Sequence, residues 1–443
     1  MSSSLALPAR GGSSRLAAIV VGLCWLVVLF DGLDMFIYGS VLPHMLETKA
    51  LGIDPGKAGD VGSYATFGML IGALCSGTVS DWVGRKKTII ASTAVFSLAS
   101  AVCAVAGSLG VFSLGRFLAG LGLGGLLPSA ITMVTEYAPK GRRALIVGSL
   151  MTAHQAGGIV AGFVALGTGD WRVSFWICVI PLFIGVPLAA AFLPESMSFL
   201  QAKGRTDEAR ALADRYGVDL AARAEERQAV ADRFSAVTAL FRGGRWMQTL
   251  LFWIASFGGL LLVYGVSQWL PSLMKANGYN LGSSIGFVIV INLGGIVGML
   301  IGGRLTDKFG GSRISAIWFG ATAVGIYSLS FKMALPLTYT VVFLTGMFLF
   351  SAQAMIYATV AHRSEDDNRA TAVGWTSGMG RFGAVFGPWL GGHLLATGST
   401  TAGFTAFALA GVFSLVFVSL TGLRRVQATP PSSVPQRELT VTG

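Results

Sequence analysis

Twelve apolar segments, each long enough to cross a lipid bilayer, divide this chain of 443 residues. A helix needs about 20 residues to span the hydrocarbon core. Hydrophobic residues make up 53% of the sequence and charged residues only 12%, against about 25% charged residues in soluble domains. We therefore predict an all-α integral membrane protein with twelve transmembrane helices, over residues 16–42, 58–79, 88–107, 109–137, 144–166, 171–193, 248–274, 283–302, 314–333, 336–361, 370–396 and 401–423.

The two halves of the chain repeat one another at a constant difference in residue number. Residues 77–87 match residues 303–313, including a glycine, an aspartate and a basic end in the same places. We call the difference that takes Gly77 to Gly303 the repeat offset. Three further landmarks keep it: Arg143-Ala144 matches Arg369-Ala370, Gly148 matches Gly374, and Tyr38-Gly39 matches Tyr264-Gly265. A repeat of six apolar segments predicts two pseudo-symmetric six-helix bundles.

The segment between the halves breaks the hydrophobic pattern. Residues 194–247 hold nine basic and eight acidic residues, which suits a solvated connector. We predict an N-terminal bundle over 1–193, a cytoplasmic linker over 194–247 and a C-terminal bundle over 248–423. The proline- and serine-rich residues 424–443 are predicted to form a disordered cytoplasmic tail.

The net charge of +11 could indicate a nucleic-acid partner, but the basic residues collect in alternate loops. With both termini in the cytoplasm, 25 of the 32 Lys and Arg residues lie on the inner side, five on the outer side and two within helices. Cytoplasmic loops of membrane proteins carry such an excess. We predict a multi-pass protein of the cytoplasmic membrane, with both termini inside and no nucleic-acid partner.

Nothing in the sequence indicates an enzyme. The four cysteines lie in predicted spans at no metal-like spacing, and no nucleophile, metal-ligand cluster or phosphate loop stands out. Gly122 and Gly124 lie in a membrane segment with no strand before them, unlike the glycines of a dinucleotide site. We expect no metal and no cofactor.

Several motifs carry a resemblance to a known family. The paired 77–87 and 303–313 segments resemble the signature loops of the major facilitator superfamily, residues 116–124 its helix 4 motif, and residues 193–196 the sequence after helix 6. Within that superfamily, residues 31–43 and 369–388 are similar to the aromatic acid:proton symporter family, closer to its benzoate-type than to its 4-hydroxybenzoate-type members. The 364–368 loop departs from the pattern of many relatives.

The resemblance implies a symporter that imports an aromatic carboxylate, of benzoate or hydroxybenzoate type, by alternating access. The proton gradient would drive it, and its partners would be a small aromatic carboxylate, protons and membrane lipid; we expect a monomer. Three alternatives stay open: a carrier of another organic anion, an exporter, and a transporter-like membrane receptor.

Four charged residues, Asp31, Asp34, Arg116 and Arg381, lie well away from the ends of the predicted spans. Such residues are functional candidates because a charge at mid-bilayer costs about 2.5–3.5 kcal/mol. Counted along the helix axis at about 1.5 Å per residue, Asp34 and Arg116 lie at similar depths and could pair. We predict a proton-coupling site of Asp31, Asp34 and Arg116, with His154 as a relay near neutral pH. The alternatives are a static ion pair between two helices and a histidine that only packs.

Arg381 lies near the bilayer midplane, and a guanidinium can bind a carboxylate through two parallel hydrogen bonds. We therefore predict that it holds the substrate anion, facing Gln155, its counterpart at the repeat offset. A structural role, in which it satisfies backbone carbonyls, is the alternative. An aromatic ring needs flat apolar walls, and Tyr38, Tyr264, Gln268, Tyr357 and Trp375 lie on helices of the kind that line a cavity, so we predict that they bind substrate. Contact with lipid or with neighbouring helices is the alternative for the aromatic residues.

The charged apparatus exists in one half only. At the repeat offset Asp31 and Asp34 map onto Phe257 and Leu260, and Arg116 maps onto Val342. Proton handling is thus predicted in the first half and anion binding mainly in the second. The resemblance also implies an inner gate, in which Asp81 contacts Arg143 and the start of the eleventh helix; its residues are Asp81, Arg85, Lys87, Arg143, Asp307, Arg313 and Arg369. Basic loops that only set the topology are the alternative for its Arg and Lys residues.

Overall fold

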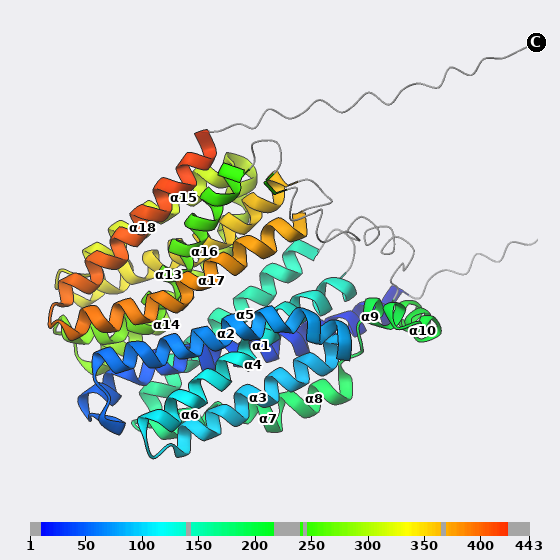
Figure 1. Ribbon diagram of the computed structural model, residues 1–443, viewed down its shortest axis with the longest axis horizontal. Helices are drawn as coiled ribbons and strands as arrows, with labels where there is room; N and C mark the ends of the chain where they lie inside the picture. Colours follow the sequence, from blue (N-terminus) through cyan, green and yellow to red (C-terminus); the bar gives the residue numbers. More distant parts are fainter. Residues whose placement is uncertain (1–9, 139–142, 217–239, 242–245, 365–368, 424–443) are drawn as a thin grey trace, which may run out of the picture.

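The computed structural model describes residues 10–138, 143–216, 240–241, 246–364 and 369–423. Among these residues the chain is almost entirely helical and has no strand. Two groups of long helices lie side by side, one from each half of the chain (Figure 1). The first group comprises α1 (Arg10–Glu47), α2 (Pro55–Val83), α3 (Arg85–Val105), α4 (Leu109–Tyr137), α5 (Arg143–Thr168), α6 (Trp171–Ile177), α7 (Ile180–Phe183) and α8 (Gly185–Phe192), with the 3₁₀ turn η1 (Ala50–Gly52) after α1.

The second group repeats this arrangement with six uninterrupted helices. They are α13 (Trp246–Ala276), α14 (Leu281–Phe309), α15 (Gly311–Ser328), α16 (Leu335–Arg363), α17 (Arg369–Ala396) and α18 (Thr400–Leu423). In the described part of the chain, nine spans are long and apolar enough to cross a membrane by length and composition alone. The helices α2, α15 and α17 complete the twelve that the sequence predicts.

The sixth predicted span, 171–193, is present as one apolar span over Trp171–Phe192, but its helix is interrupted twice. It consists of α6, α7 and α8, with interruptions at Cys178–Val179 and at Ile184. Pro181 and Pro187 follow the two interruptions. Because proline has no backbone N–H and its ring clashes with the preceding turn, each breaks the helical hydrogen-bond ladder.

The sequence repeat is visible in the backbone. Gly84 separates α2 from α3 with φ 101°, and Gly310 separates α14 from α15 with φ 87°. Each glycine N–H donates to the carbonyl four residues earlier, of Ser80 and of Thr306, at 3.0 Å. Side chains rarely adopt such φ values, so both turns require glycine.

The first helices of the two halves, α1 and α13, do not pack at equivalent positions. Gly157 on α5 packs against the carbonyl of Leu29 on α1, whereas its counterpart Gly383 on α17 packs against the carbonyl of Phe257 on α13. The repeat offset would take Leu29 to Ala255, but the equivalent contact is made by Phe257, two residues further along α13. The counterparts of Asp31 and Asp34 are therefore Gly259 and Leu262, which corrects the pairing predicted from sequence and leaves the asymmetry between the halves unchanged.

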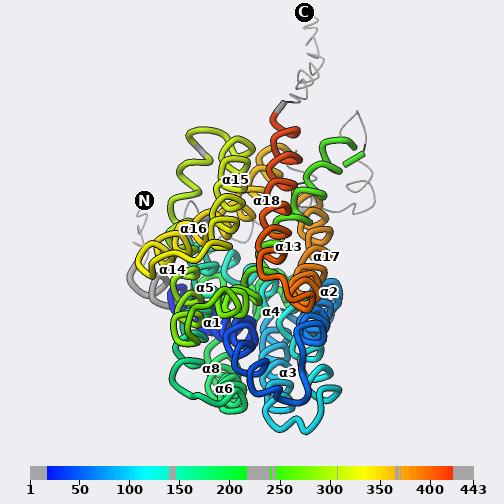
Figure 2. Tube along the Cα trace, turned by 90° about the vertical axis from the view of Figure 1, so that its left-hand side faces the viewer, coloured from blue at the N-terminus to red at the C-terminus, as the bar shows by residue number. Residues whose placement is uncertain are grey.

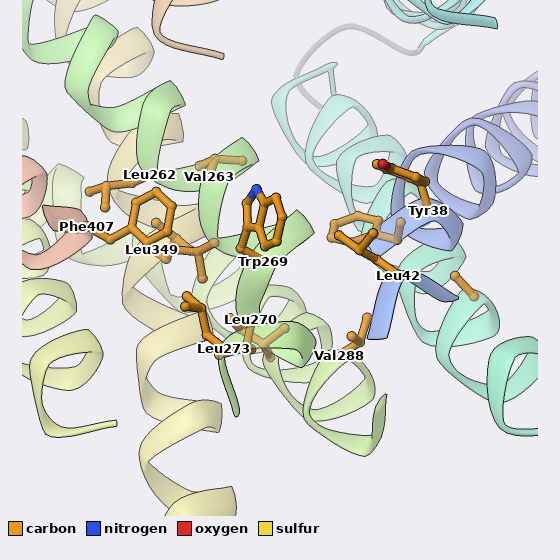
Figure 3. Close-up of a cluster of buried hydrophobic side chains, with 14 of the residues drawn as sticks. Tyr38, Leu42, Leu262, Val263, Trp269, Leu270, Leu273, Val288, Leu349 and Phe407 are labelled. Carbon is orange, nitrogen blue, oxygen red and sulfur yellow. The ribbon is translucent and has the colours of Figure 1, made fainter. Parts of the chain in front are cut away.

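The two halves meet near the loops that were predicted to lie outside. Helix α2 lies against α17, and α5 lies against α14 (Figure 2). The Ser63 hydroxyl donates to the Val385 carbonyl at 2.8 Å, and the indole of the fully buried Trp269 donates to the Pro388 carbonyl at 2.8 Å. Figure 3 shows Trp269 within a buried apolar cluster that includes Tyr38 and Leu42 of α1.

The described start of the predicted linker forms two helices. Helices α9 (Met197–Ala202) and α10 (Thr206–Tyr216) lie at the end of the first bundle (Figure 1). Helix α10 is mostly exposed and packs only one face, with Ala209, Ala213 and Tyr216 buried. The Tyr216 ring packs edge-on against Tyr137 of α4, with 4.7 Å between ring centroids. Residues 217–239, 242–245 and the predicted tail 424–443 lie outside the described part.

Candidate functional site

Asp34 is the point where three helices of the first half meet. Arg116 of α4 donates from Nη1 to the Asp34 Oδ1 at 2.8 Å, and the Ser100 hydroxyl of α3 donates to Oδ2. The side chains of Asp34 and Arg116 are 0% and 3% exposed. The predicted ion pair is thus present and buried, and Ser100 is a partner that the sequence analysis missed. In the sequence, Ser100 is marked only as a polar residue in the apolar segment 88–107.

Aromatic rings surround the Arg116 guanidinium. Its Cζ lies 5.7 Å from the centroid of the Tyr38 ring and 5.5 Å from that of Phe175. The Tyr38 hydroxyl donates to the Ala58 carbonyl of α2 at 3.0 Å. Tyr38 therefore belongs to the surroundings of the Asp34 pair, and its hydroxyl is already engaged within the first half.

Asp31 lies one turn away and contacts His154 of α5. The His154 Nε2 is 3.7 Å from the Asp31 Oδ2, and the two side chains are 18% and 3% exposed. The Asp31 Oδ1 is buried and has no hydrogen-bond partner among the described residues. Close approach of α1 and α5 requires Gly32, since a methyl group there would collide with the His154 carbonyl.

Arg381 of α17 is half-buried and makes no hydrogen bond or ion pair with the described residues. Its charge lies close enough to act on Asp31 and on the Tyr264 hydroxyl, and Tyr264 in turn interacts with Tyr357 of α16. Electrostatic interactions thus link four of the predicted site residues, which lie on α1, α13, α16 and α17. An arginine that lacks a protein partner in this interior can bind an anion through its full set of donors.

Three buried amide groups lie on α5, α13 and α14. The Gln155 Oε1, the Gln268 Nε2 and the Asn292 Oδ1 are buried without a partner among the described residues. Gln268 of α13 reaches Gly62 of α2, and Asn292 of α14 packs on Gly158 of α5. A buried polar group without a partner is destabilising by about 1–3 kcal/mol, so these amides are candidates for contact with ligand or water. The two glutamines were predicted site residues, whereas Asn292 was not.

Two buried phenylalanine rings pack beside His154. Phe36 of α1 packs edge-on against His154 at 5.5 Å and against Phe350 of α16 at 6.3 Å between centroids. Neither phenylalanine was singled out in sequence, because a phenylalanine in a membrane segment gives no signal of the face it occupies.

Trp375 does not join the Arg381 cluster, and its predicted place there is wrong. It is 44% exposed and stacks on Trp253 of α13 at 5.6 Å. Along α17 it shares an exposed stripe with Phe382, Phe386 and Trp389. Arg381 lies on another face of that helix, because six residues correspond to about one and two-thirds turns.

The predicted gate residues lie at the other end of the bundle. Asp81 pairs with Arg85 one turn further on, at 2.5 Å, and Arg369 donates to the Ala361 carbonyl at 2.9 Å. Lys87 and Arg313 are exposed. The side chains of Arg143 and Asp307 lie outside the described residues, so the contact between Asp81 and Arg143 stays a prediction.

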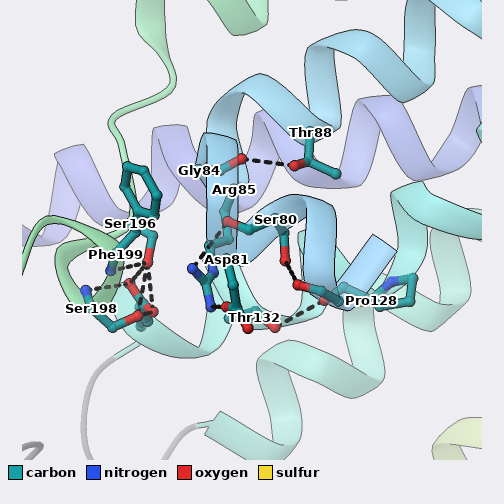
Figure 4. Close-up of polar contacts among 12 residues, drawn as sticks. Ser80, Asp81, Gly84, Arg85, Thr88, Pro128, Thr132, Ser196, Ser198 and Phe199 are labelled. Atoms are coloured by element: carbon teal, nitrogen blue, oxygen red, sulfur yellow. Dashed lines mark hydrogen bonds and ion pairs between the residues drawn. The ribbon is translucent and has the colours of Figure 1, made fainter. Parts of the chain in front are cut away.

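An acidic cluster beside this gate was missed in sequence. The Glu195 carboxylate accepts from the backbone N–H of Lys86 at 3.0 Å, at the start of α3. The Glu136 carboxylate of α4 accepts from the hydroxyls of Ser196 and Ser198, which lie near the Asp81–Arg85 pair (Figure 4). The 193–196 motif was its signal. In the described part of the chain, no group of three His, Cys, Asp or Glu residues could hold a metal ion.

The family model described as Major Facilitator Superfamily matches residues 24–352 and 282–442. The chain belongs to this superfamily. It is therefore a multi-pass membrane transporter rather than an enzyme, and the twelve helices in two six-helix bundles are the major facilitator fold.

Within this superfamily, the chain is similar to transporters of aromatic acids. The chain is 34% identical to the benzoate transport protein of Acinetobacter baylyi, over 96% of this chain and 93% of that protein. It is 34% identical to a gentisate transporter of Corynebacterium glutamicum, over 94% and 89% of the two chains. It is 32% identical to a 4-hydroxybenzoate transporter of Pseudomonas putida, over 93% of each. The predicted likeness to aromatic acid transporters is confirmed.

Solved structures share the fold at low sequence identity. A partially occluded, inward-open structure of the xylose transporter of Escherichia coli superposes with a TM-score of 0.74 at 16% identity, covering 94% of this chain and 99% of that one. A D-xylose–proton symporter gives a TM-score of 0.70 at 18% identity, over 91% and 97%.

Proposed function

We propose that this protein is a proton-coupled symporter that imports an aromatic carboxylate, of benzoate or hydroxybenzoate type, across the cytoplasmic membrane. The main support for the proposal is Arg381, a half-buried arginine that makes no hydrogen bond or ion pair with the described residues and whose charge acts on Asp31 and Tyr264. Both termini would lie in the cytoplasm, and the proton gradient would supply the energy without a cofactor.

The substrate class follows from chemistry and from the relatives. A guanidinium can hold a carboxylate through two parallel hydrogen bonds, and the rings of Tyr264, Tyr357, Phe36 and Phe350 offer apolar walls for a planar ring. Transporters of benzoate, gentisate and 4-hydroxybenzoate are 32–34% identical to this chain. An aromatic monocarboxylate fits both lines of support.

Coupling to protons follows from competition for Arg381. An ionised Asp31 interacts with the guanidinium and would repel a substrate carboxylate brought to it. A proton on Asp31 removes this repulsion, so the proton and the anion favour each other's binding, as coupling between two sites must be reciprocal. His154, whose Nε2 lies 3.7 Å from the Asp31 Oδ2, would pass that proton, and Asp34 with Arg116 would form a second titrating site.

Alternating access is supported by where the halves touch. The contacts of α2 with α17 and of α1 with α13 lie near the predicted outer loops, and Lys275 reaches Glu47 across the halves at 2.5 Å. A bundle joined at its outer end suits an inward-facing state. Import then requires that these contacts open while the gate around Asp81 closes.

The test is uptake of radiolabelled benzoate and 4-hydroxybenzoate into cells that express the chain, with and without a protonophore. We expect protonophore-sensitive uptake of at least one acid and loss of this uptake in Arg381→Ala. In Arg381→Lys we expect a higher KM, since lysine cannot form two parallel hydrogen bonds to a carboxylate. Arg210→Ala, on the exposed face of α10, is the matched control and should transport normally.

Other outcomes would redirect the proposal. Uptake of neither acid by well-expressed protein would favour a carrier of another organic anion. Efflux driven by the proton gradient would favour an exporter, and ligand binding without flux a receptor. Normal proton-driven uptake in the Asp31→Asn, Asp34→Asn double variant would show that these carboxylates do not couple protons.

A further inference from the structure

A second site lies in the C-terminal half, away from Arg381. A cavity of about 840 Å³ opens where α14 turns into α15 and where α16 and α18 end. Three basic side chains line it: Arg313, His362 and Arg363. Among the described residues no acidic side chain lines it. The first backbone N–H groups of α15 also face this turn, and such groups have no partner within their own helix.

A buried hydroxyl points to a missing ligand. The Thr306 side chain lines the cavity, is 7% exposed, and its Oγ1 has no partner among the described residues. Its counterpart in the first half, Ser80, satisfies its hydroxyl by donating to the Gly77 carbonyl at 3.0 Å. A buried threonine hydroxyl beside three basic side chains is therefore a donor without an acceptor.

The first half of the same chain shows what fills the equivalent space. There the Glu195 carboxylate sits at the start of α3 and accepts from the Lys86 N–H at 3.0 Å. A methyl group added at Gly84 would collide with that carboxylate, whereas one added at the counterpart Gly310 would meet no atom within 4 Å. The anion that closes this turn in the first half is thus part of the chain.

The second half has no acidic residue at the positions equivalent to Glu136 and Glu195. At the repeat offset Glu136 corresponds to His362, and Glu195 corresponds to Thr421. The scaffold around them is retained, since Tyr137 donates to the Glu195 carbonyl and Arg363 to the Thr421 carbonyl, both at 2.7 Å. Two carboxylates have been lost, and basic side chains line the space.

We propose that this cavity binds a phosphate-bearing anion, which takes the place that the Glu195 carboxylate holds in the first half. Arg313 and His362 would contact the phosphate oxygens, together with the Thr306 hydroxyl and the first N–H groups of α15, a favourable place for an anion. The headgroup of an acidic membrane lipid and a free phosphate share this chemistry. Phe309 and Ile317, which are 50% and 58% exposed, line the cavity beside the basic groups and suit an acyl chain.

The test uses the purified full-length chain in detergent, with phosphatidylglycerol, phosphatidylcholine or sodium phosphate added at constant ionic strength. We expect an acidic phosphate to raise Tm by mass action, because it binds the folded state. Thr421→Glu supplies an internal carboxylate that can accept from the Ser312 N–H, so it should abolish the added shift. Native mass spectrometry should show loss of the bound anion in this variant, with affinity reduced at least about tenfold.

The arms separate the two sources and leave the proposal open to refutation. A rise in Tm with phosphatidylglycerol alone would identify the ligand as a lipid headgroup. An equal rise with sodium phosphate would identify it as a free anion. Should Thr421→Glu not fold, Arg313→Gln and His362→Gln must each weaken the anion-dependent shift, while Arg210→Gln must not. An equal anion response in wild type and in the Thr421→Glu or Arg313→Gln variants would overturn the site, as would no response to either anion.

Discussion

The Arg116 guanidinium of α4 donates to the Asp34 carboxylate of α1 at 2.8 Å, and both side chains are buried. Because Ser100 of α3 donates to the second carboxylate oxygen, one acid ties three helices of the first half together. Removing one partner of such a buried pair destabilises the folded protein, because the remaining charge is left buried without its counterion.

We predict that Asp34→Asn lowers the free energy of unfolding by about 3–5 kcal/mol, since Arg116 then lies buried without a counter-charge. The double variant Asp34→Asn, Arg116→Gln should recover much of this loss without restoring proton coupling. Thermal unfolding of the purified variants measures the first effect and protonophore-sensitive uptake the second. A double variant no more stable than Asp34→Asn would show that the buried charge is not the cause.

Close helix packing gives a matched set of glycine variants. Gly120 on α4 faces the carbonyl of Ala65, and Gly346 on α16 faces that of Ile291, so the two contacts correspond at the repeat offset. Gly120→Ala or Gly346→Ala forces the helices apart, and we expect a loss of about 1–3 kcal/mol from overpacking. The controls are Gly148→Ala and Gly374→Ala, where an added methyl group meets no atom within 4 Å.

These controls should be neutral or slightly stabilising, since alanine is the better helix former by about 1 kcal/mol. Expression level and Tm in detergent report both classes of variant. If all four variants behaved alike, glycine would matter for the flexibility of the helices and not for their close approach.

The ion pair between the halves should bias the transport cycle. Lys275 Nζ lies 2.5 Å from Glu47 Oε2, and the side chains are 26% and 56% exposed. Because solvent screens such an exposed pair, its contribution is small, and Glu47→Gln should shift the balance toward outer opening by up to about fivefold. Distances between spin labels on α1 and α13 would measure this shift, and the swapped pair Glu47→Lys, Lys275→Glu should restore it. An unchanged distribution in Glu47→Gln would remove this pair from the gate.

Hydropathy and the repeat predicted most of the fold from the sequence. The helix bounds differ by a few residues, and Gly84 and Gly310 keep the predicted register. The shift of α1 against α13 could not be predicted, because it depends on which backbone carbonyl each interface glycine meets. The break at Cys178–Val179 was predictable in principle from Pro181.

The site was predictable where charge made a residue conspicuous. Asp34 and Arg116 are paired as expected, because burying a charge costs less when an opposite charge lies within hydrogen-bond distance. The face of Trp375 was not predictable, since lipid and protein interior are equally apolar and hydropathy does not distinguish them. Ser100 and Asn292 escaped notice because small polar residues are common in membrane helices.

Asp54 gives a prediction on pH at the start of α2. Its carboxylate caps the helix by accepting from the Lys57 N–H at 2.9 Å, and this hydrogen bond, together with the Lys57 ammonium, lowers the pKa of Asp54 in the folded protein. A lowered pKa stabilises the fold above the unfolded value of about 3.9, and this stabilisation is lost as the pH falls through the folded pKa. Replacing the cap by alanine typically costs about 0.5–2 kcal/mol, so Asp54→Ala should be less stable than wild type at pH 7, by a Tm shift of about 1 °C.

The difference between the two proteins should shrink below pH 4, as wild-type Asp54 becomes protonated. Asp54→Asn keeps an acceptor for the Lys57 N–H and does not titrate, so it should retain most of the cap at neutral pH and show no pH dependence of its own. Thermal unfolding of the three proteins in one detergent between pH 7 and pH 3 measures this. A constant difference between wild type and Asp54→Ala over that range would mean that the cap does not depend on the charge of Asp54.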